Sequence, residues 1–509
     1  MRIAVEGCAH GELEIIYNTI TEAEKVDGKK VDLLICCGDF QATRNLTDLK
    51  CMAVPDKFKD MCSFYKYYSG EKIAPVLTIF IGGNHEASNY LQELPYGGWV
   101  APNIFYMGYA SVVKVGNVRI AGLSGIYKGH DWLQGHFEKP PYTDQTLRSV
   151  YHVRNLEVFR LKQLSGKIDI FLSHDWPRGV TQYGNVQALL RKKPFFQNDI
   201  EGNCLGSPVN MDLLQKHYPS FWFAAHLHCK FAALIPEEEG SRNTKFLALD
   251  KCLPRRKFLQ IIQVENDANI PLKLSYDLEW LTILSLTNHL LSVKCGMHMM
   301  PGSGDTVRWM YTPTEEEKEH VLGKMNNILQ VPQNFVKNVE PYDPNSSPRK
   351  TEAPSLRTNP QTTELCNKLG IDDPVALLQV LNGIKEVKRD SSFSNTDLDS
   401  SFAAELDTSA SESFDQTFES SSCTFDDEDS SFQSSLETQP VGSLRHRMTP
   451  LKLPPAKLGL SSPESSDELS SKVNEEVSEK IPVVPIEPDM KKFKRRNQSI
   501  YTSQEDSVE

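Results

Sequence analysis

The chain has 509 residues, which is long enough for two or three domains. Its formal net charge of -12 is unevenly spread, because residues 351–509 hold 16 Lys and Arg against 29 Asp and Glu. No apolar run is as long as the roughly 18 residues of a membrane helix, and the chain starts with a strand pattern, so we expect neither a membrane span nor a signal peptide. The 11 Cys follow no disulfide spacing, so we expect a reducing compartment, the cytosol or nucleus.

The first part of the chain alternates between strand and helix patterns, as α/β proteins do. Continuous apolar runs predict buried strands at 2–7, 31–37, 75–81 and 168–174. Apolar residues at helical spacing predict helices at 12–25 and 148–164, and a hairpin is expected at 112–123 around Gly116-Asn117. This order favours parallel strands joined by helical crossovers.

A group of short strands follows, predicted at 221–225, 231–235, 244–249 and 258–264. We expect these strands to form a second sheet, so that the core is a two-sheet sandwich with helices outside. Helices are expected at 280–291 and 315–329. The segment 359–382 is apolar enough to dock on the core.

The composition changes after about residue 385. Residues 391–440 hold 12 acidic residues and no Lys or Arg, with isolated Phe residues in Ser-rich sequence. Such a segment buries too little apolar surface to fold, so we expect a disordered solvating linker, with partner binding through its Phe residues as the alternative. The basic run 491–496 is either a nuclear import signal or a charged terminus.

Side chains that commonly bind metals follow five of the predicted strands. They are Cys8 and His10, then Asp39, then Asn84 and His85, then His174, and finally His226 and His228. Ligands of α/β proteins bind beyond the carboxyl ends of strands, and Gly82-Gly83 lets the backbone turn sharply at one of them. A polar turn explains any single one of these, but five together indicate a metal site.

Among these side chains, Asp39 is the only carboxylate placed to be shared by two cations. Two metals roughly 3.5–4 Å apart can clamp a phosphoryl group and activate a water for attack on it. Neutral imidazoles would bind the metals while one anion bridges them, which limits the negative charge of the site. The chain has no CxxC pair, so a closed, Cys-rich structural zinc site is not favoured.

Several motifs resemble the calcineurin-like metallophosphoesterases, which carry a dinuclear centre on a β-sandwich. They are Gly38-Asp39, Gly83-Asn84-His85-Glu86, His174 and Ala225-His226-Leu227-His228. That family opens with Asp-x-His, but Gly7-Cys8-Ala9-His10 has Cys in the Asp position, and Ala225 stands where the last motif has Gly. The Cys is typical of the RNA lariat debranching enzymes, which the chain resembles from residue 1 to about 375, also at Tyr96-Gly-Gly-Trp99, His174-Asp-Trp-Pro177 and Leu249-Asp-Lys-Cys-Leu-Pro254.

This resemblance implies two sets of metal ligands that share one residue. The first metal would be held by Cys8, His10, Asp39 and His228, and the second by Asp39, Asn84, His174 and His226. His85 matches the histidine beside the phosphate, a general acid for the leaving oxygen or, alternatively, a residue that only orients its neighbours. A soft thiolate favours Zn²⁺ or Fe²⁺ over Mg²⁺ at the first position, while the second would also accept Mn²⁺.

The resemblance also implies a branched (lariat) intron RNA as the substrate. Segment 124–154 corresponds to the family's lariat recognition loop, and it mixes cations with aromatic residues, which contact phosphates and stack on unpaired bases. The predicted RNA-binding residues are Tyr127, Lys128, His130, Trp132, Arg148, Tyr151, His152 and Arg154. A loop packed on its own domain is the alternative.

The predicted fold is α/β (α+β), a metallophosphoesterase β-sandwich flanked by helices. We expect a catalytic domain over 1–264, a helical C-terminal domain packed on it over 265–385, and a disordered acidic tail over 386–509. The expected function is hydrolysis of the 2′-5′ phosphodiester at the branch point of excised introns, in the nucleus, with shuttling to the cytoplasm and splicing-related partners of the tail left open. The alternatives are another dinuclear metallophosphoesterase, either a nuclease or a phosphoprotein phosphatase, and an inactive scaffold.

Overall fold

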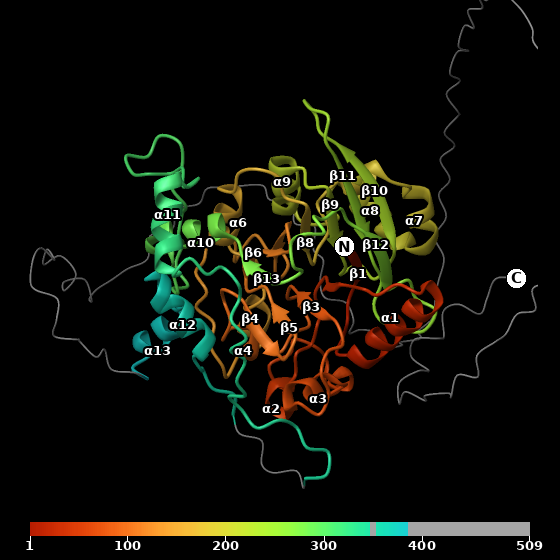
Figure 1. Ribbon diagram of the computed structural model, residues 1–509, viewed down its shortest axis with the longest axis horizontal. Coiled ribbons are helices and arrows are strands. Elements are labelled where there is room, and N and C mark those ends of the chain that lie inside the picture. Colours follow the sequence, from red (N-terminus) through yellow and green to blue (C-terminus); the bar gives the residue numbers. More distant parts are fainter. Residues whose placement is uncertain (347–352, 385–509) are drawn as a thin grey trace, which may run out of the picture. The chain divides into compact units, whose positions relative to one another are not determined.

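Two β-sheets form the centre of the computed structural model, which describes residues 1–346 and 353–384 (Figure 1). The first sheet has the strand order β12-β1-β2-β3-β5-β4, and the second has the order β10-β11-β9-β8-β7-β6-β13. The strands of the first sheet are β1 (Arg2–Glu6), β2 (Leu33–Cys36), β3 (Leu77–Phe80), β4 (Gly98–Ala101), β5 (Ile104–Tyr106) and β12 (Leu259–Gln263). Those of the second are β6 (Ala110–Val115), β7 (Val118–Leu123), β8 (Ile170–Ser173), β9 (Phe221–Ala224), β10 (Phe231–Pro236), β11 (Asn243–Ala248) and β13 (Leu274–Tyr276).

The strands that lead to the predicted metal ligands run parallel within their sheets. In the first sheet β1, β2 and β3 pair in parallel, and in the second β8 pairs in parallel with β9. Their residues are apolar on both faces because each strand is covered from both sides. Ile3 and Ile35 of the first sheet pack against Leu172 of the second in the layer between the sheets.

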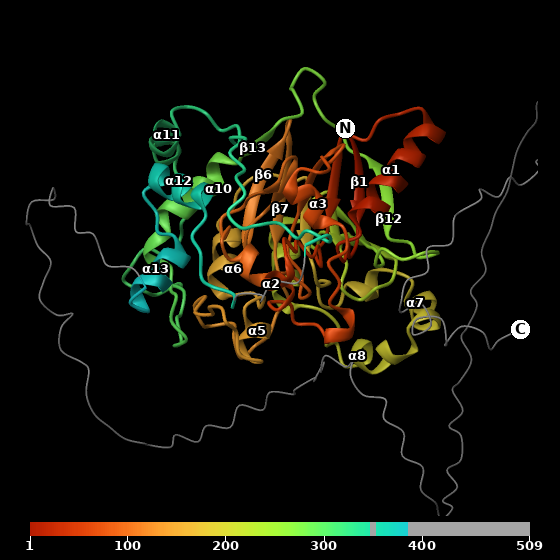
Figure 2. The ribbon, with the colours of Figure 1, turned by 90° about the horizontal axis from the view of Figure 1, so that it is seen from below.

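Helices cover the outer face of each sheet (Figures 1 and 2). Helices α1 and α3 pack on the first sheet, while α6, α9, α10 and α12 pack on the second. The helices are α1 (Leu13–Asp27), α2 (Leu46–Leu49), α3 (Phe64–Ser69), α4 (Ser88–Leu91), α5 (Thr146–Ser149), α6 (Asn155–Lys162), α7 (Val186–Lys192), α8 (Gln197–Glu201), α9 (Pro208–His217), α10 (Leu278–Leu286), α11 (Glu315–Lys324), α12 (Pro360–Leu369) and α13 (Pro374–Leu381). None of the helices in the described residues is both long and apolar enough to cross a membrane.

The predicted two-sheet α/β fold is confirmed, but two of its parts are wrong. The strand near 258–264 joins the first sheet, where β12 lies antiparallel to β1, and not the second. The helix expected over 148–164 is interrupted between α5 and α6. There the Ile126 N–H donates to the Tyr151 carbonyl at 3.3 Å and the Val153 N–H donates to the Ile126 carbonyl at 2.9 Å. This long-range pairing replaces the local helical hydrogen bonds.

Helices α10 to α13 lie together at one side of the sheets in both views (Figures 1 and 2). One side chain from this group completes the edge of the first sheet. The Gln361 amide accepts the backbone N–H of Trp99 at 2.8 Å and donates to the Trp99 carbonyl at 2.9 Å. Because β4 is the edge strand, Gln361 takes the place of a further strand residue. The predicted tail over 386–509 lies outside the described residues.

Replacing Gln361 by Ala should destabilise the protein, because it leaves a buried N–H and a buried carbonyl of Trp99 without partners. The expected loss in the free energy of unfolding is about 2–5 kcal/mol for the two groups together. Urea unfolding of the full chain measures it. The exposed Gln197→Ala is the control and should change stability by less than about 0.5 kcal/mol. Equal stability of the two variants would contradict this role of Gln361.

Candidate metal centre

The loops after β1, β2, β3, β8 and β9 bring the predicted ligands together. Cys8, His10, Asp39 and His228 offer ligand atoms that all lie within 4.8 Å of one another. On the other side of Asp39, the Nε2 atom of His174 lies 3.2 Å from Asp39 Oδ1 and 3.1 Å from Asn84 Oδ1. The rings of His174 and His226 are 5.0 Å apart. Asp39 therefore stands between two groups of side chains that come from both sheets.

Three buried atoms of this cluster have no hydrogen-bond partner among the described residues. They are the Nε2 atom of His10, the Nε2 atom of His228 and the Oδ2 atom of Asp39. Burying an ionised oxygen and two imidazole nitrogens without partners is costly, unless a cation binds their lone pairs. A thiol, imidazoles, an amide and one carboxylate form a donor set that suits a divalent transition metal. The residues present thus fit the metal ions of the predicted centre.

His174 shows the same fit through its two ring nitrogens. Its Nδ1–H donates to the carbonyl of Cys37 at 2.8 Å, so this bond fixes the ring orientation. The Nε2 atom then points at the side-chain oxygens of Asp39 and Asn84. That arrangement requires either a proton on Nε2 or a cation among the three atoms.

The backbone around the ligands is both tight and strained. A Cβ on Gly83 would lie 2.2 Å from Asp39 Oδ1, and one on Gly38 would lie 2.3 Å from His174 Nδ1. Both positions therefore need Gly because side chains approach closely, a more specific reason than the sharp turn expected at Gly83. Four of the candidate ligands adopt the left-handed region, with φ values of 45° (His10), 46° (Asp39), 58° (His226) and 47° (His228). Such residues cluster at functional sites.

Glu86 holds two of the ligand loops together and is not one of the candidate ligands. Its buried carboxylate accepts the backbone N–H groups of Phe40 at 2.7 Å, Gln41 at 2.9 Å and Gly83 at 2.9 Å. It thereby joins the loop that carries Asp39 to the loop that carries Asn84. Burial raises the pKa of Glu86 to about 7, and the three N–H groups oppose that shift. The sequence placed Glu86 in the motif but contained no signal for this role.

The electrostatics of the centre favour neutral imidazoles around one carboxylate. Burial lowers the pKa of His10 to about 3 and that of His226 to about 3. Burial would raise the pKa of Asp39, but His174 and His85 hold it well below its usual value. Burial, together with Asp39 and Glu6, raises the pKa of the Cys8 thiol. Neutral His and ionised Asp are the forms that bind metals, and Cys8 needs a cation to lose its proton.

Two lysines contribute positive charge near the candidate ligands. Burial is the largest cause of the lowered pKa values of His10, His226 and His228. The charge of Lys251 lowers the pKa of His10 and of His228 further, and the charge of Lys128 lowers that of His226. Both side chains are half-buried. Lys128 was predicted from the sequence as a site residue, whereas Lys251 was only part of the motif Leu249-Asp-Lys-Cys-Leu-Pro254, to which no role was assigned. Their charges suit an anionic ligand at the metals.

His85 lies beside the carboxylate that the two groups share. Its backbone N–H donates to Asp39 Oδ1 at 2.9 Å, and its Nδ1 atom lies 3.3 Å from Asp39 Oδ2. The side chain is 25% exposed, in contrast to the 0% of His174. A solvent-accessible imidazole at this place is free to exchange protons with a bound molecule.

Segment 124–154 divides into exposed and buried residues. His130 and Arg148 are exposed and Lys128 is half-buried. Tyr127 and Trp132 are also half-buried and meet edge to face with ring centres 5.6 Å apart. In contrast, Tyr151, His152 and Arg154 are buried.

Arg154 holds the segment together from inside. Its guanidinium donates to the Glu138 carboxylate at 2.5 Å and to the backbone carbonyls of Gly135, Ser149 and His152. An Arg buried in this way stabilises the loop and does not face a ligand in solution. Arg154 therefore supports the segment from within, since its side chain is only 1% exposed.

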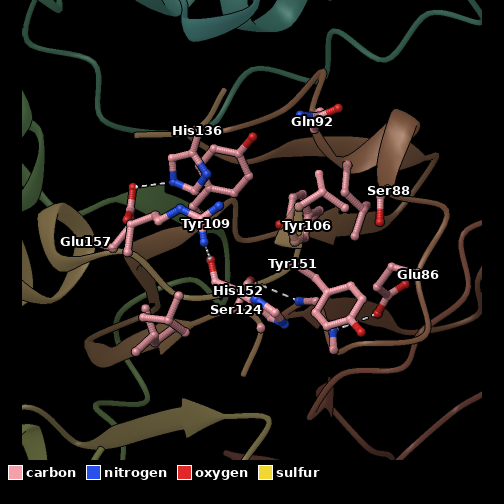
Figure 3. A pocket seen from close by; sticks show the side chains of 18 residues that line it. Glu86, Ser88, Gln92, Tyr106, Tyr109, Ser124, His136, Tyr151, His152 and Glu157 are labelled. Carbon is pink, nitrogen blue, oxygen red and sulfur yellow. Dashed lines mark hydrogen bonds and ion pairs between the residues drawn. The ribbon is translucent and has the colours of Figure 1, made fainter. Parts of the chain in front are cut away.

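A small cavity separates the Glu86 loop from segment 124–154 (Figure 3). Its volume is about 40 Å³, and its lining includes Gly83, Glu86, Tyr151 and His152. This volume is enough for a few water molecules and too small for a nucleotide base. The cavity is therefore not a candidate binding site for a nucleotide.

Replacing Glu86 by Gln should weaken metal binding, because an amide N–H₂ would face backbone N–H groups that now donate to the carboxylate. Residues that orient metal ligands typically change metal affinity by roughly 10- to 100-fold. Competition with a chromophoric chelator measures the affinity in the full chain. The exposed Glu22→Gln on α1 serves as the control. An unchanged affinity in Glu86→Gln would show that the two loops hold their positions without this carboxylate.

Comparison with known proteins places this geometry in a family. The chain matches the calcineurin-like phosphoesterase family over residues 1–230 and the C-terminal domain of lariat debranching enzyme over residues 241–374. A lariat debranching enzyme of Drosophila melanogaster is 50% identical, covering 99% of this chain and 100% of its own length. Lariat debranching enzymes of Homo sapiens (57% identical, covering 74% of this chain and 71% of that one) and Arabidopsis thaliana (49%, 73% and 86%) are also similar. The chain belongs to the lariat debranching enzyme family, within the calcineurin-like phosphoesterases, and is a hydrolase that acts on phosphodiester bonds.

Proposed function

We propose that the protein hydrolyses the 2′-5′ phosphodiester bond at the branch point of lariat intron RNA, as a step of mRNA processing. The observation that supports this most is the convergence of Cys8, His10, Asp39 and His228 on one side and of Asn84, His174 and His226 on the other. Cys8 stands where other phosphoesterases have Asp, and the named relatives are debranching enzymes.

Two cations would share Asp39 in this proposal. Cys8, His10, Asp39 and His228 would hold the first, and Asp39, Asn84, His174 and His226 would hold the second. Such ions activate water and neutralise phosphate charge. The protein residues set the geometry. Glu86 fixes the two loops, Cys37 orients His174, and the glycines leave room for the carboxylate.

His85 is the proposed general acid. Hydrolysis at the branch leaves the 2′ oxygen of the branch nucleotide as an alkoxide, which needs a proton. The half-exposed imidazole of His85 lies beside Asp39, within reach of a phosphate held at the centre. The Asp39 carboxylate, 3.3 Å from Nδ1, orients the ring.

Segment 124–154 is the proposed RNA-binding surface, through its accessible residues only. Lys128 and Arg148 would meet phosphates, while Tyr127 and Trp132 would contact bases. Tyr151 and His152 are buried, so we assign them to the support of that surface. The charge of Lys251, which acts on His228, would also favour an anionic substrate at the centre.

The test of the function compares three substrates at equal concentration. The full chain loaded with divalent metal should convert branched RNA into a linear RNA with a free 2′ hydroxyl and a 5′ phosphate. Linear 3′-5′ RNA and a small phosphomonoester should react much more slowly. Equal cleavage of linear RNA would indicate a general nuclease, and preference for the monoester would indicate a phosphatase. No reaction with any of them would indicate an inactive scaffold.

His85→Ala should lower kcat for branched RNA by roughly 10²- to 10⁴-fold, which is the usual contribution of a general acid. The metal content should stay near that of the parent, because His85 is not among the proposed ligands. Elemental analysis and single-turnover kinetics on the same preparation separate the two effects. A loss of metal in His85→Ala would instead assign the residue to the coordination of the ions.

The proposed metals follow from the thiolate. Sulfur is a soft ligand, so the first position should hold Zn²⁺ or Fe²⁺ in preference to Mg²⁺. The second position has only nitrogen and oxygen ligands, so it should also accept Mn²⁺. A bound thiolate carries the same charge as the Asp it replaces, so the substitution changes metal preference more than it changes charge.

Cys8→Ser should lower both metal content and activity, and Cys8→Asp should recover part of the activity with Mn²⁺ while binding Zn²⁺ more weakly than the parent. Elemental analysis and assays with each added metal check this. Cys366→Ser, at a buried Cys of α12, controls for loss of packing. If Cys8→Ser kept the parent's metal content and metal preference, Cys8 would be an ordinary buried residue and not a ligand.

We also propose that the basic run 491–496 directs the protein to the nucleus and that the acidic segment before it binds splicing-related proteins; both lie outside the described residues. Replacing the Lys and Arg residues of 491–496 by Ala should disperse a fluorescently labelled chain through the cell. Its activity on branched RNA should stay unchanged, because every proposed metal ligand precedes residue 229. Unchanged nuclear fluorescence would reject the signal.

A further inference from the structure

Segment 124–154 contains a second convergence of ligand atoms, separate from the candidate metal centre. The Nε2 atom of His130 lies 3.1 Å from Asp131 Oδ2, and the Nδ1 atom of His152 lies 2.5 Å from the same oxygen. All three atoms lie within 4.8 Å of one another. We propose that His130, Asp131 and His152 bind a Zn²⁺ ion, in addition to the ions of the candidate metal centre.

One of the separations already matches a tetrahedral ion, and a second must lengthen. With zinc bonds of about 2.0–2.1 Å, tetrahedral ligand atoms lie roughly 3.3 Å apart. The contact from His130 is already close to that value, at 3.1 Å. The contact from His152 must lengthen, which a rotation of the Asp131 carboxylate provides. Two imidazoles and one carboxylate, with water as the fourth ligand, form a zinc site of the open type.

The backbone positions the three side chains before any ion binds. The Ile126 N–H and the Val153 N–H hold the two ends of the segment together, and the Asn155 N–H donates to the Trp132 carbonyl at 2.9 Å. Asp131 is fixed in its own turn by its N–H, which donates to the Lys128 carbonyl at 3.2 Å. Residues 21 positions apart therefore meet without further ordering, which lowers the entropic cost of binding.

Burial and charge also favour an ion at this place. Asp131 and His152 have side chains that are 3% and 6% exposed, whereas His130 is 69% exposed and leaves the site open to solvent. Lys128 and Arg154 oppose a cation here, but the charge of Arg154 is paired with Glu138.

A zinc ion here would connect the two ends of the segment and add positive charge to the surface around it. The inference does not depend on the proposed reaction, because it concerns metal binding alone. The competing explanation is that the carboxylate only accepts hydrogen bonds from the two rings. The two explanations differ in the number of ions that the chain binds.

The test is equilibrium dialysis of the full chain against buffered Zn²⁺, followed by elemental analysis of zinc per chain. The parent is compared with His130→Ala, with Asp131→Asn, which removes the charge but keeps the shape, and with His320→Ala as control. His320 is exposed on α11, outside both clusters. We expect His130→Ala and Asp131→Asn each to bind one equivalent less than the parent, and His320→Ala to match it.

A spectroscopic measurement identifies the ligands of the one ion that the parent binds and His130→Ala does not. The difference in visible absorption between Co²⁺-loaded parent and Co²⁺-loaded His130→Ala should show the bands of a four- or five-coordinate nitrogen and oxygen site. Equal zinc in all four proteins would overturn the proposal. If Asp131→Asn fails to fold, the zinc content of His130→Ala tests the proposal by itself. We expect that variant to fold because the removed side chain is largely exposed.

Discussion

The Oδ1 atom of Asp39 accepts the backbone N–H of His85 at 2.9 Å, while its Oδ2 atom is buried with no hydrogen-bond partner among the described residues. The first contact joins the loop after β2 to the loop after β3. The burial of Oδ2 leaves a charged oxygen in the protein interior, which costs several kcal/mol unless a cation binds there. The fold thus holds the carboxylate where a bound cation would compensate its buried charge, with the His85 Nδ1 atom 3.3 Å from Oδ2 as its nearest side-chain nitrogen neighbour on that side.

The rest of the architecture maintains this position. Three ligand loops come from the first sheet and two from the second, so ions bound to Asp39 would connect the two halves of the sandwich. Glu86 prevents the two loops next to the carboxylate from moving apart. The helical segment after β13 supports the far edge of the first sheet through Gln361. Stability and metal binding are therefore linked, as in other metal sites whose ligands come from distant parts of a chain.

Much of the site could be predicted from the sequence because its signals are local. A buried strand that ends in Gly and then shows His, Asp or Asn is visible in a few residues, and parallel strands bring such ends together. The position of β12 and the break in the helix at Tyr151 could not be predicted, since both depend on pairing between residues far apart in the chain. The roles of Glu86 and Arg154 could not be predicted from the sequence for another reason. Their residue types suit a ligand or a phosphate contact, and only burial and the three or four N–H bonds that each makes show that they hold loops in place.

The central claim is that one buried carboxylate is shared by two cations. X-ray absorption at the zinc and manganese edges of the full chain loaded with both metals tests it most directly, because the metal–metal separation appears as a separate shell. A shared Asp39 predicts a separation of roughly 3.5–4 Å and its loss in Asp39→Asn. A spectrum that shows isolated ions with no metal neighbour, or one that Asp39→Asn leaves unchanged, would contradict the claim.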